Sequence, residues 1–221
     1  MKSIYSMFLP ENKVRKVLQK YDIPVVEEKT VGSYQKAIKV ADKIGYPVVL
    51  KINSKQVSHK TEVGGVLTGL RYPNEVEQAF EKIKQNAEKF NVKFEGVLVQ
   101  KMGSGYEVII GGKRDPQFGP VVMFGLGGTL VELLKDVSFR VCPVDKKEIR
   151  EMIFETKGSQ LLNGFRGKPK GDIDALVETI HKVSQIMVHE EIDEMDINPL
   201  FVLPEGQGVL AVDFRIYKME D

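Results

Sequence analysis

A lysine in an apolar strand, followed by a polar loop with two glycines, is the first feature of the sequence that indicates chemistry. The stretch from Pro47 to Val66 reads PVVLKINSKQVSHKTEVGGV, and alternation along an extended strand places Lys51 beside apolar neighbours. An ammonium group there needs an anionic partner, and phosphate oxygens suit it. Lys60, Gly64 and Gly65 in the loop could add donors and a close backbone approach. A lysine reaching over a surface hairpin from a strand end would give the same pattern.

His59 lies in this loop, between Ser58 and Lys60, with no apolar pattern around it. The setting argues against a core histidine. An imidazole with an ordinary titration point of about 6.5 is a neutral nucleophile near physiological pH. An exposed loop histidine without a role is the common alternative. The other two histidines, His181 and His189, fall on a predicted helix and are assigned no catalytic role.

Asn198 and Asp213 are predicted to lie on neighbouring strands near the end of the chain. Their oxygens are the kind of ligand that Mg²⁺ takes from a protein when water and phosphate complete its coordination. A hairpin with polar residues on its wet face is the simpler alternative. The predicted metal ligands and Lys51 support each other, because a nucleoside triphosphate needs both a metal ion and a cationic side chain.

Three further features could contact a nucleotide. Glu107, on a predicted strand, could bond a ribose hydroxyl, although a solvated glutamate would look the same. Val99 to Met102 could present backbone groups to an adenine edge. The glycine-rich segment Gly125 to Gly128 follows a strand without the GxGxxG spacing of a dinucleotide site, and we interpret it as a flexible loop near the phosphates.

Composition limits the function classes. The 32 basic and 31 acidic residues nearly cancel, so the sequence favours neither nucleic acid nor membrane as a partner. The one cysteine, Cys142, excludes an internal disulfide and a cysteine metal cluster. The first residues, MKSIYSMFLPENK, are too polar for a signal peptide, and no apolar run of about 20 residues exists. We therefore expect a cytoplasmic protein.

Helical and strand patterns alternate along the 221 residues. Apolar spacing predicts helices over residues 11–21, 146–155 and 172–189, one capped by Ser33 and ended by Gly45, and one capped by Asn74. Strands are predicted at 25–28, 65–71, 121–124 and 138–141, and residues 95–102 and 107–112 are expected to form a hairpin. Two final strands joined by 204–208 should place Leu210, Val212, Phe214 and Ile216 on the core face, with Asp213 looking away.

These elements predict an α+β domain of two lobes. We expect one lobe to cover approximately residues 22–100. The other should cover approximately 101–221 together with the N-terminal helix within residues 1–21.

The chain resembles the ATP-grasp β subunit, or β domain, of ADP-forming acyl-CoA synthetases, the acetate:CoA ligases related to succinyl-CoA synthetase. The resemblance covers nearly the whole chain. It rests on the following segments, in this order: YDIPVVEEKTV, IGYPVVLKINS, SHKTEVGGV, GVLVQKM, EVIIGGKRDPQFGPVVMFGLGG, LLKDVSFRVCPV, MDINPL and VLAVDFR.

The resemblance implies an ATP-grasp fold with ATP or ADP held between two lobes and Mg²⁺ as cofactor. It implies Lys51 on the phosphates, Ser58 to Lys60 in the phosphate loop and Glu107 near the ribose. Gln100, Lys101 and Met102 would lie along the adenine, and Asn198 and Asp213 would hold Mg²⁺. His59 matches a histidine that is thought to relay the phosphoryl group in the acetate-type branch.

The function implied by the resemblance is half of a reversible ligase that converts acyl-CoA, ADP and phosphate into acid, ATP and CoA. A separate α subunit would carry the CoA-binding domain and a phosphorylated histidine, neither of which this chain contains. A nucleotide-binding regulatory module without turnover and a stand-alone ATP-grasp ligase are the alternatives. Loss of Lys51, Asn198 or Asp213 would have favoured the former, and the latter needs an acceptor site that the sequence does not reveal. The acid, the direction and the choice of ATP or GTP stay open.

Overall fold

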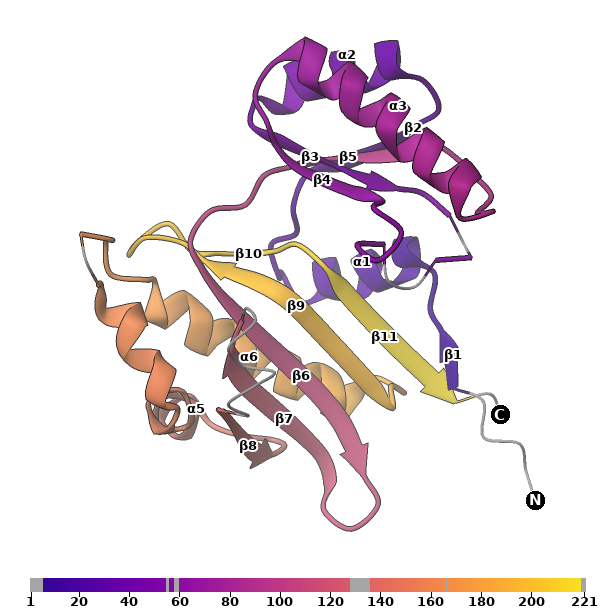
Figure 1. The fold of residues 1–221 in the computed structure, drawn as a ribbon. Coiled ribbons are helices and arrows are strands. Elements are labelled where there is room, and N and C mark those ends of the chain that lie inside the picture. Colours follow the sequence, from indigo (N-terminus) through magenta and orange to yellow (C-terminus); the bar gives the residue numbers. More distant parts are fainter. Residues whose placement is uncertain (1–5, 55, 58–59, 128–135, 166, 220–221) are drawn as a thin grey trace. The chain divides into compact units, whose positions relative to one another are not determined.

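The strands of this protein form two separate antiparallel sheets, which belong to two structural units. The computed structural model describes residues 6–54, 56–57, 60–127, 136–165 and 167–219. The larger unit consists of Met1–Val25 and Ser104–Asp221, and the smaller unit is Val26–Gly103. The smaller unit is therefore inserted, in sequence, after the first helix of the larger one (Figure 1).

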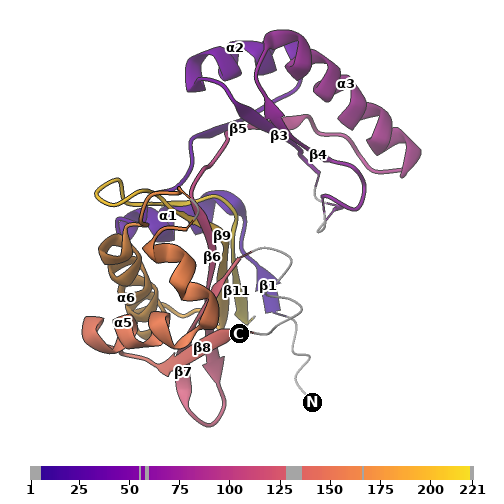
Figure 2. The same ribbon diagram turned by 60° about the vertical axis from the view of Figure 1, so that its left-hand side comes forward.

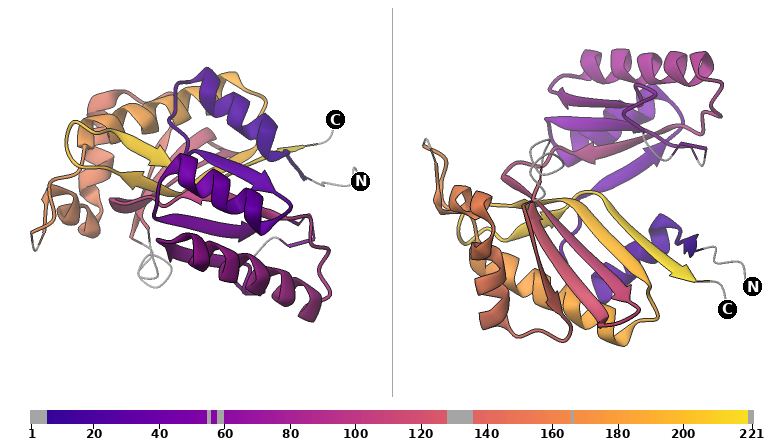
Figure 3. Two further views of the ribbon diagram at one scale, coloured as in Figure 1. Left: turned by 90° about the horizontal axis from the view of Figure 1, so that it is seen from above. Right: turned by 60° about the horizontal axis from the view of Figure 1, so that its bottom comes forward.

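The smaller unit is a four-stranded sheet with two helices packed on one face (Figure 1). Figure 3 (left) shows these two helices side by side. Its sheet order is β2-β5-β3-β4. The elements are β2 (Glu28–Val31), α2 (Tyr34–Ile44), β3 (Val48–Ile52), β4 (Val66–Leu70), α3 (Pro73–Lys89) and β5 (Val97–Lys101).

The two helices of this unit begin and end for local reasons. The Ser33 hydroxyl accepts a hydrogen bond from the backbone of Lys36 at the start of α2, and Gly45, with φ of +85°, ends the helix, as predicted. The prediction that Asn74 caps α3 is wrong. Tyr72 occupies the cap and Pro73 the first helical position, where its missing N–H costs nothing.

The larger unit is built on a seven-stranded sheet of order β1-β11-β9-β6-β7-β8, with β10 also paired to β9. The strands are β1 (Ser6–Phe8), β6 (Tyr106–Asp115), β7 (Gly119–Leu126), β8 (Val137–Val141), β9 (Glu194–Val202), β10 (Val209–Ala211) and β11 (Phe214–Met219). The helices are α1 (Glu11–Lys20), α5 (Lys146–Glu155), the 3₁₀ helix η1 (Lys157–Asn163) and α6 (Ile173–His189).

One face of the larger sheet forms the core. Helices α5 and α6 lie along that face (Figure 2), and α1 adds Val14 and Leu18 to the same cluster. Phe124 on β7 and Ile110 on β6 are fully buried there. Replacing a side chain of this kind with alanine typically costs about 2–5 kcal/mol. Among the described residues, no helix is long and apolar enough to cross a membrane.

Two predictions about strands are wrong. Residues 95–102 and 107–112 do not form a hairpin, because β5 pairs with β2 and β3 in one sheet and β6 with β7 and β9 in the other (Figure 3, right). The strand expected at residues 25–28 begins at Glu28, and Val25 makes only an isolated bridge to Ala211. The local sequence pattern does not encode which strands pair with β5 and β6, or that Val25 contacts Ala211. The glycine-rich loop also starts later than expected, since Gly125 belongs to β7 and Gly128 lies outside the described residues.

The face assignment of the last strand is wrong in its first half. Val209 and Ala211 lie in the core in place of Leu210 and Val212, whereas Phe214 and Ile216 face the core as predicted. The reason is a one-residue bulge in β9, which pairs Leu200 with Val108 but Ile197 with Ile110. Since β10 and β11 follow β9 in constant register, both change face at the same place.

Candidate functional site

Lys51 lies on the helix-free face of the smaller sheet. Val48, Leu50 and Ile52 of β3 are fully buried against α2 and α3, and alternation puts the half-buried Lys51 on the other side. Its neighbours across the ladder are Val66 on β4 and Leu98 on β5. The strand therefore holds an ammonium group beside apolar side chains.

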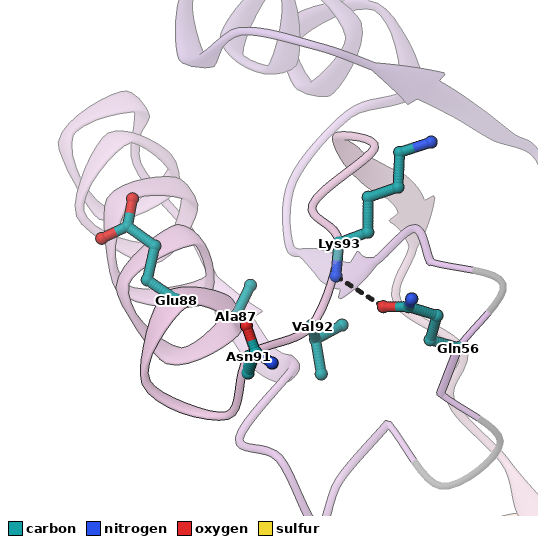
Figure 4. Close-up of a pocket in the computed structure, with 6 residues that line it drawn as sticks. All are labelled: Gln56, Ala87, Glu88, Asn91, Val92 and Lys93. Atoms are coloured by element: carbon teal, nitrogen blue, oxygen red, sulfur yellow. Dashed lines mark hydrogen bonds between the residues drawn. The ribbon is translucent and has the colours of Figure 1, made fainter.

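Several described residues between β3 and β4 make hydrogen bonds that hold their positions. The Gln56 side-chain oxygen accepts a hydrogen bond from the Lys93 backbone at 2.8 Å (Figure 4), and the Asn86 amide of α3 donates to the Gly64 carbonyl at 2.8 Å. Gly65 donates to the Lys60 carbonyl at 2.8 Å. A Cβ atom at Gly65 would lie 2.5 Å from the Ile52 side chain, so only glycine permits this approach. The backbone at Lys60 is thereby held in place.

A surface pocket of about 530 Å³ lies beside this loop, at the end of α3 (Figure 4). None of the residues predicted to bind nucleotide lines it, so we do not assign the nucleotide to it. Its lining residues are Gln56, Ala87, Glu88, Asn91, Val92 and Lys93.

Residues 100–102, which are predicted to line the adenine, make hydrogen bonds within the smaller unit. The buried Gln100 amide donates to the Glu28 carboxylate at 2.6 Å, on the same helix-free face as Lys51. The Lys101 ammonium donates to the carbonyl of Gly45, at the end of α2, at 2.7 Å. The backbone N–H of Met102 donates to the Pro47 carbonyl at 3.1 Å. The Lys101 side chain is thus directed at α2.

Glu107 is exposed on β6, on the face of the larger sheet away from the core. Its carbonyl accepts a hydrogen bond from Gly127 at 2.7 Å, and a Cβ atom at Gly127 would lie 2.9–3.1 Å from Glu107 atoms. The glycine lets the end of β7 close onto the strand that carries the carboxylate. A ribose hydroxyl could reach such an exposed group.

Asn198 and Asp213 lie directly opposite each other. The Asn198 backbone N–H donates to the Asp213 carbonyl at 2.8 Å, and opposed residues of an antiparallel pair project from the same face. Asn198 is exposed and Asp213 half-buried, at the bulge in β9. Two oxygen ligands, one on β9 and one in the segment between β10 and β11, fit a Mg²⁺ ion that keeps water and phosphate in its remaining positions. Within the described ranges no group of three His, Cys, Asp or Glu side chains could hold a metal without such help.

Asp196 lies close to this pair in sequence and was not assigned to the candidate site in the sequence analysis. It lies two residues before Asn198 on β9, opposite Arg215 on β11. Burial raises the pKa of the Asp196 carboxyl, Arg215 opposes this effect, and Asp213 and Glu194 add to it. A cation bound at Asn198 and Asp213 would favour the charged form of Asp196. The D-x-N spacing was a visible signal, but only pairing with Arg215 distinguishes Asp196 from a solvated carboxylate.

The structure therefore brings Asn198 and Asp213 together and places Lys51 and Gln100 on one face of the smaller sheet. Ser58 and His59 lie outside the described residues.

The two α+β units, each an antiparallel sheet with helices on one face, and these polar positions define the class to which the protein belongs. The chain matches the model of the ATP-grasp domain family over residues 5–217, and it is a member of that family. The predicted ATP-grasp fold is confirmed.

Similarity within the family is high. The chain is 44% identical over 211 residues to the β subunit of an ADP-forming acetate–CoA ligase II of Pyrococcus furiosus, covering 93% of this chain and 89% of that subunit. It is 46% identical over 209 residues to the ADP-forming acetate–CoA ligase I of Archaeoglobus fulgidus, covering 93% of this chain and only 30% of that longer protein. The predicted resemblance to the β subunit or β domain of these ligases is confirmed.

A solved relative has the same fold. It is the dinucleotide-forming acetyl-coenzyme A synthetase 1 of Ca. Korarchaeum cryptofilum, with a TM-score of 0.80 and 44% identity over 95% of this chain and 92% of that one. That protein was solved with coenzyme A and Mg-AMPPCP, and with its phosphohistidine segment pointing towards the nucleotide-binding site.

Proposed function

We propose that this chain is the nucleotide-binding subunit of an ADP-forming acyl-CoA synthetase. The enzyme would interconvert acyl-CoA, ADP and phosphate with the acid, ATP and CoA. The observation that carries the proposal is the match, at 44% identity, to 89% of the length of a subunit named β in such a ligase. The direct opposition of Asn198 and Asp213 supports it, because a magnesium nucleotide needs oxygen ligands of this kind.

In this proposal the chain catalyses transfer of a phosphoryl group between a phosphohistidine and ADP. A terminal oxygen of ADP attacks the phosphorus, the new P–O bond forms as the P–N bond breaks, and the imidazole nitrogen keeps the electron pair. Mg²⁺, held by Asn198 and Asp213, would neutralise charge on the phosphates. Lys51 and Lys60 would hold the phosphate oxygens in line, since positioning and electrostatics supply most of the catalysis in such reactions.

The nucleotide itself would be oriented by the remaining predicted residues. Glu107 would accept a hydrogen bond from the ribose, and Gln100 to Met102 would line the adenine. Ser58 and His59 would lie on the phosphate loop, with His59 as the relay that takes the phosphoryl group before ADP does. The fixed backbone at Lys60 and Gly65 supports a loop that holds its donors in position.

A separate α subunit would complete the enzyme. This chain spans 30% of the length of the longer Archaeoglobus relative but most of the Pyrococcus β subunit, so we infer that a second chain supplies the remainder. That chain would bind CoA and carry the first phosphohistidine.

Reconstitution tests the proposal. The chain and a candidate CoA-binding α subunit from the same organism are purified separately and assayed for ATP formation from acyl-CoA, ADP and phosphate. We expect Mg·ADP binding by this chain alone, and turnover only in the mixture. Full turnover by the isolated chain would instead indicate a stand-alone ligase. Nucleotide binding without turnover in the mixture would indicate a regulatory module.

A further inference from the structure

Four apolar side chains form a block on the face of the larger sheet that looks away from the core. The ladder between β7 and β8 pairs Val121 with Val141 and Met123 with Phe139. Phe139 is 55% exposed and Val141 52% exposed, whereas the side chains that alternate with them, Ser138 and Arg140, turn toward α5. We call these four residues the apolar block. Contiguous apolar side chains of this kind on the surface mark a candidate site for binding another molecule, whereas a single exposed apolar residue would not.

The block is continuous with the proposed metal site. Across the sheet, Phe139 is followed by Met123, Gly111 and Asp196 in paired positions. A Cβ atom at Gly111 would lie 3.2 Å from the Met123 methyl, so Met123 covers the glycine and carries the apolar surface to the strand beside Asp196. Three strand spacings of about 4.8 Å put Phe139 roughly 14 Å from β9, which carries Asn198.

The molecule that covers the apolar block must bind near the proposed metal site and must present an apolar surface. The phosphates of a nucleotide would gain little from four apolar side chains, whereas a polypeptide that presents a phosphoryl group must contact the protein beside the phosphates. The solved Korarchaeum relative has a phosphohistidine segment that points towards its nucleotide-binding site. We propose that the apolar block is the docking surface for the partner segment that carries the phosphohistidine. The inference rests on the proposed function and adds the surface that receives the partner.

The test uses three variants in the reconstituted enzyme. Phe139→Ser and Val141→Thr change exposed side chains of the block, and neither residue belongs to the core cluster, so both variants should fold. Phe154→Ser is the matched control, because Phe154 is 42% exposed on α5 at the opposite face of the same sheet. Thermal unfolding and Mg·ADP binding are measured for each variant alone. Both should equal the parent's.

The rate of ATP formation is then measured as the concentration of histidine-phosphorylated α chain is varied. We expect the half-saturating concentration to rise at least tenfold for Phe139→Ser and several-fold for Val141→Thr, with the rate at saturation within twofold of the parent's. Phe154→Ser should behave as the parent.

Three results would overturn the inference. An unchanged half-saturating concentration for Phe139→Ser shows that the segment docks elsewhere. A parent chain that is dimeric alone, and becomes monomeric with Phe139→Ser, shows that a second copy occupies the block. A parent mixture that makes no ATP contradicts the proposed function itself, and the inference falls with it.

Discussion

At the scale of single residues, the carboxylates of β9 and its partner strands decide whether the larger sheet can hold a cation. Asp213 and Asn198 are opposed across the ladder, and Asp196 is half-buried beside them. Burial, and then the like charges of Asp213 and Glu194, raise the pKa of Asp196, and Arg215 opposes this effect. A cation bound at Asn198 and Asp213 would offset the repulsion between Asp196 and Asp213.

Asp213→Asn should weaken Mg·ADP binding at least tenfold while leaving the fold intact. The substitution keeps the size of the side chain and removes the negative charge that Mg²⁺ prefers. Calorimetric titration with ADP, with and without Mg²⁺, measures the effect. Glu191→Gln is the control, since Glu191 is an exposed acid of the same unit paired with Lys218. Equal Mg·ADP affinity for Asp213→Asn and the parent would show that the metal assignment is wrong.

At the scale of elements, Asp172 joins two parts of the larger unit. Its carboxylate caps α6 through the Ala175 backbone and also accepts a hydrogen bond from Gly208, in the turn between β9 and β10, at 2.8 Å. Although burial alone would raise the pKa of Asp172, hydrogen bonds from the backbone of Ala175, Gly208 and Gly206 lower it overall. The bonds are therefore stronger to the charged carboxylate than to the neutral acid.

Asp172→Ala should lower the free energy of unfolding by about 1–3 kcal/mol, because it removes a helix cap and leaves a second N–H unsatisfied. The pKa of Asp172 is lowered in the folded state. The stabilisation from its carboxylate is therefore fully present above the unfolded-state pKa of aspartate and is lost as the pH falls through the folded-state pKa. Urea unfolding at pH 7 and at acid pH measures both effects. A difference between parent and variant that grows on acidification would contradict the assignment.

Gly65→Ala tests the loop that follows β3. A methyl group would collide with the Ile52 side chain and lie 2.9 Å from the Lys60 carbonyl, so the loop must shift. We expect a loss of about 1–3 kcal/mol of stability together with weaker Mg·ADP binding.

Gly32→Ala is the control for this substitution, because a Cβ atom there meets nothing within 4 Å. It should leave both the stability and the nucleotide affinity near the parent's. If Gly65→Ala loses stability but binds Mg·ADP as the parent does, the loop supports the fold without holding phosphate.

At the scale of the whole molecule, the proposed reaction passes a phosphoryl group between two chains. His59→Asn separates a relay from a simple contact, because asparagine keeps a hydrogen-bond donor but cannot carry phosphate. We expect the variant to bind Mg·ADP almost normally. Acid-labile, alkali-stable phosphate should disappear from this chain, and the reconstituted enzyme should lose most ADP phosphorylation.

Labelled phosphate measured on each chain during turnover checks the relay. His181→Asn is the control, because the His181 ring bonds the Val144 carbonyl within the larger unit and has no proposed role in transfer. If label never reaches this chain in the parent enzyme, or if His59→Asn turns over normally, His59 is only a binding residue.

The sequence alone determined most elements and the residue types of the candidate site. Apolar spacing predicted α1, α5 and α6, Ser33 and Gly45 predicted the ends of α2, and alternation placed Lys51 opposite the buried face of β3. These signals are local, since a helix or a half-buried strand is written in the residues that form it. The family segments were equally visible, because motifs are short runs of sequence.

Only the tertiary structure decided which strands are partners and where the faces change. β5 and β6 are consecutive in sequence but belong to different sheets, and the bulge in β9 moved Val209 and Ala211 into the core. Both facts depend on register between distant segments, which no local pattern specifies. The same reason applies to the pairing of Asp196 with Arg215 and to the continuity of the apolar block with β9. Both arise only in the folded sheet, where residues far apart in the chain lie on neighbouring strands.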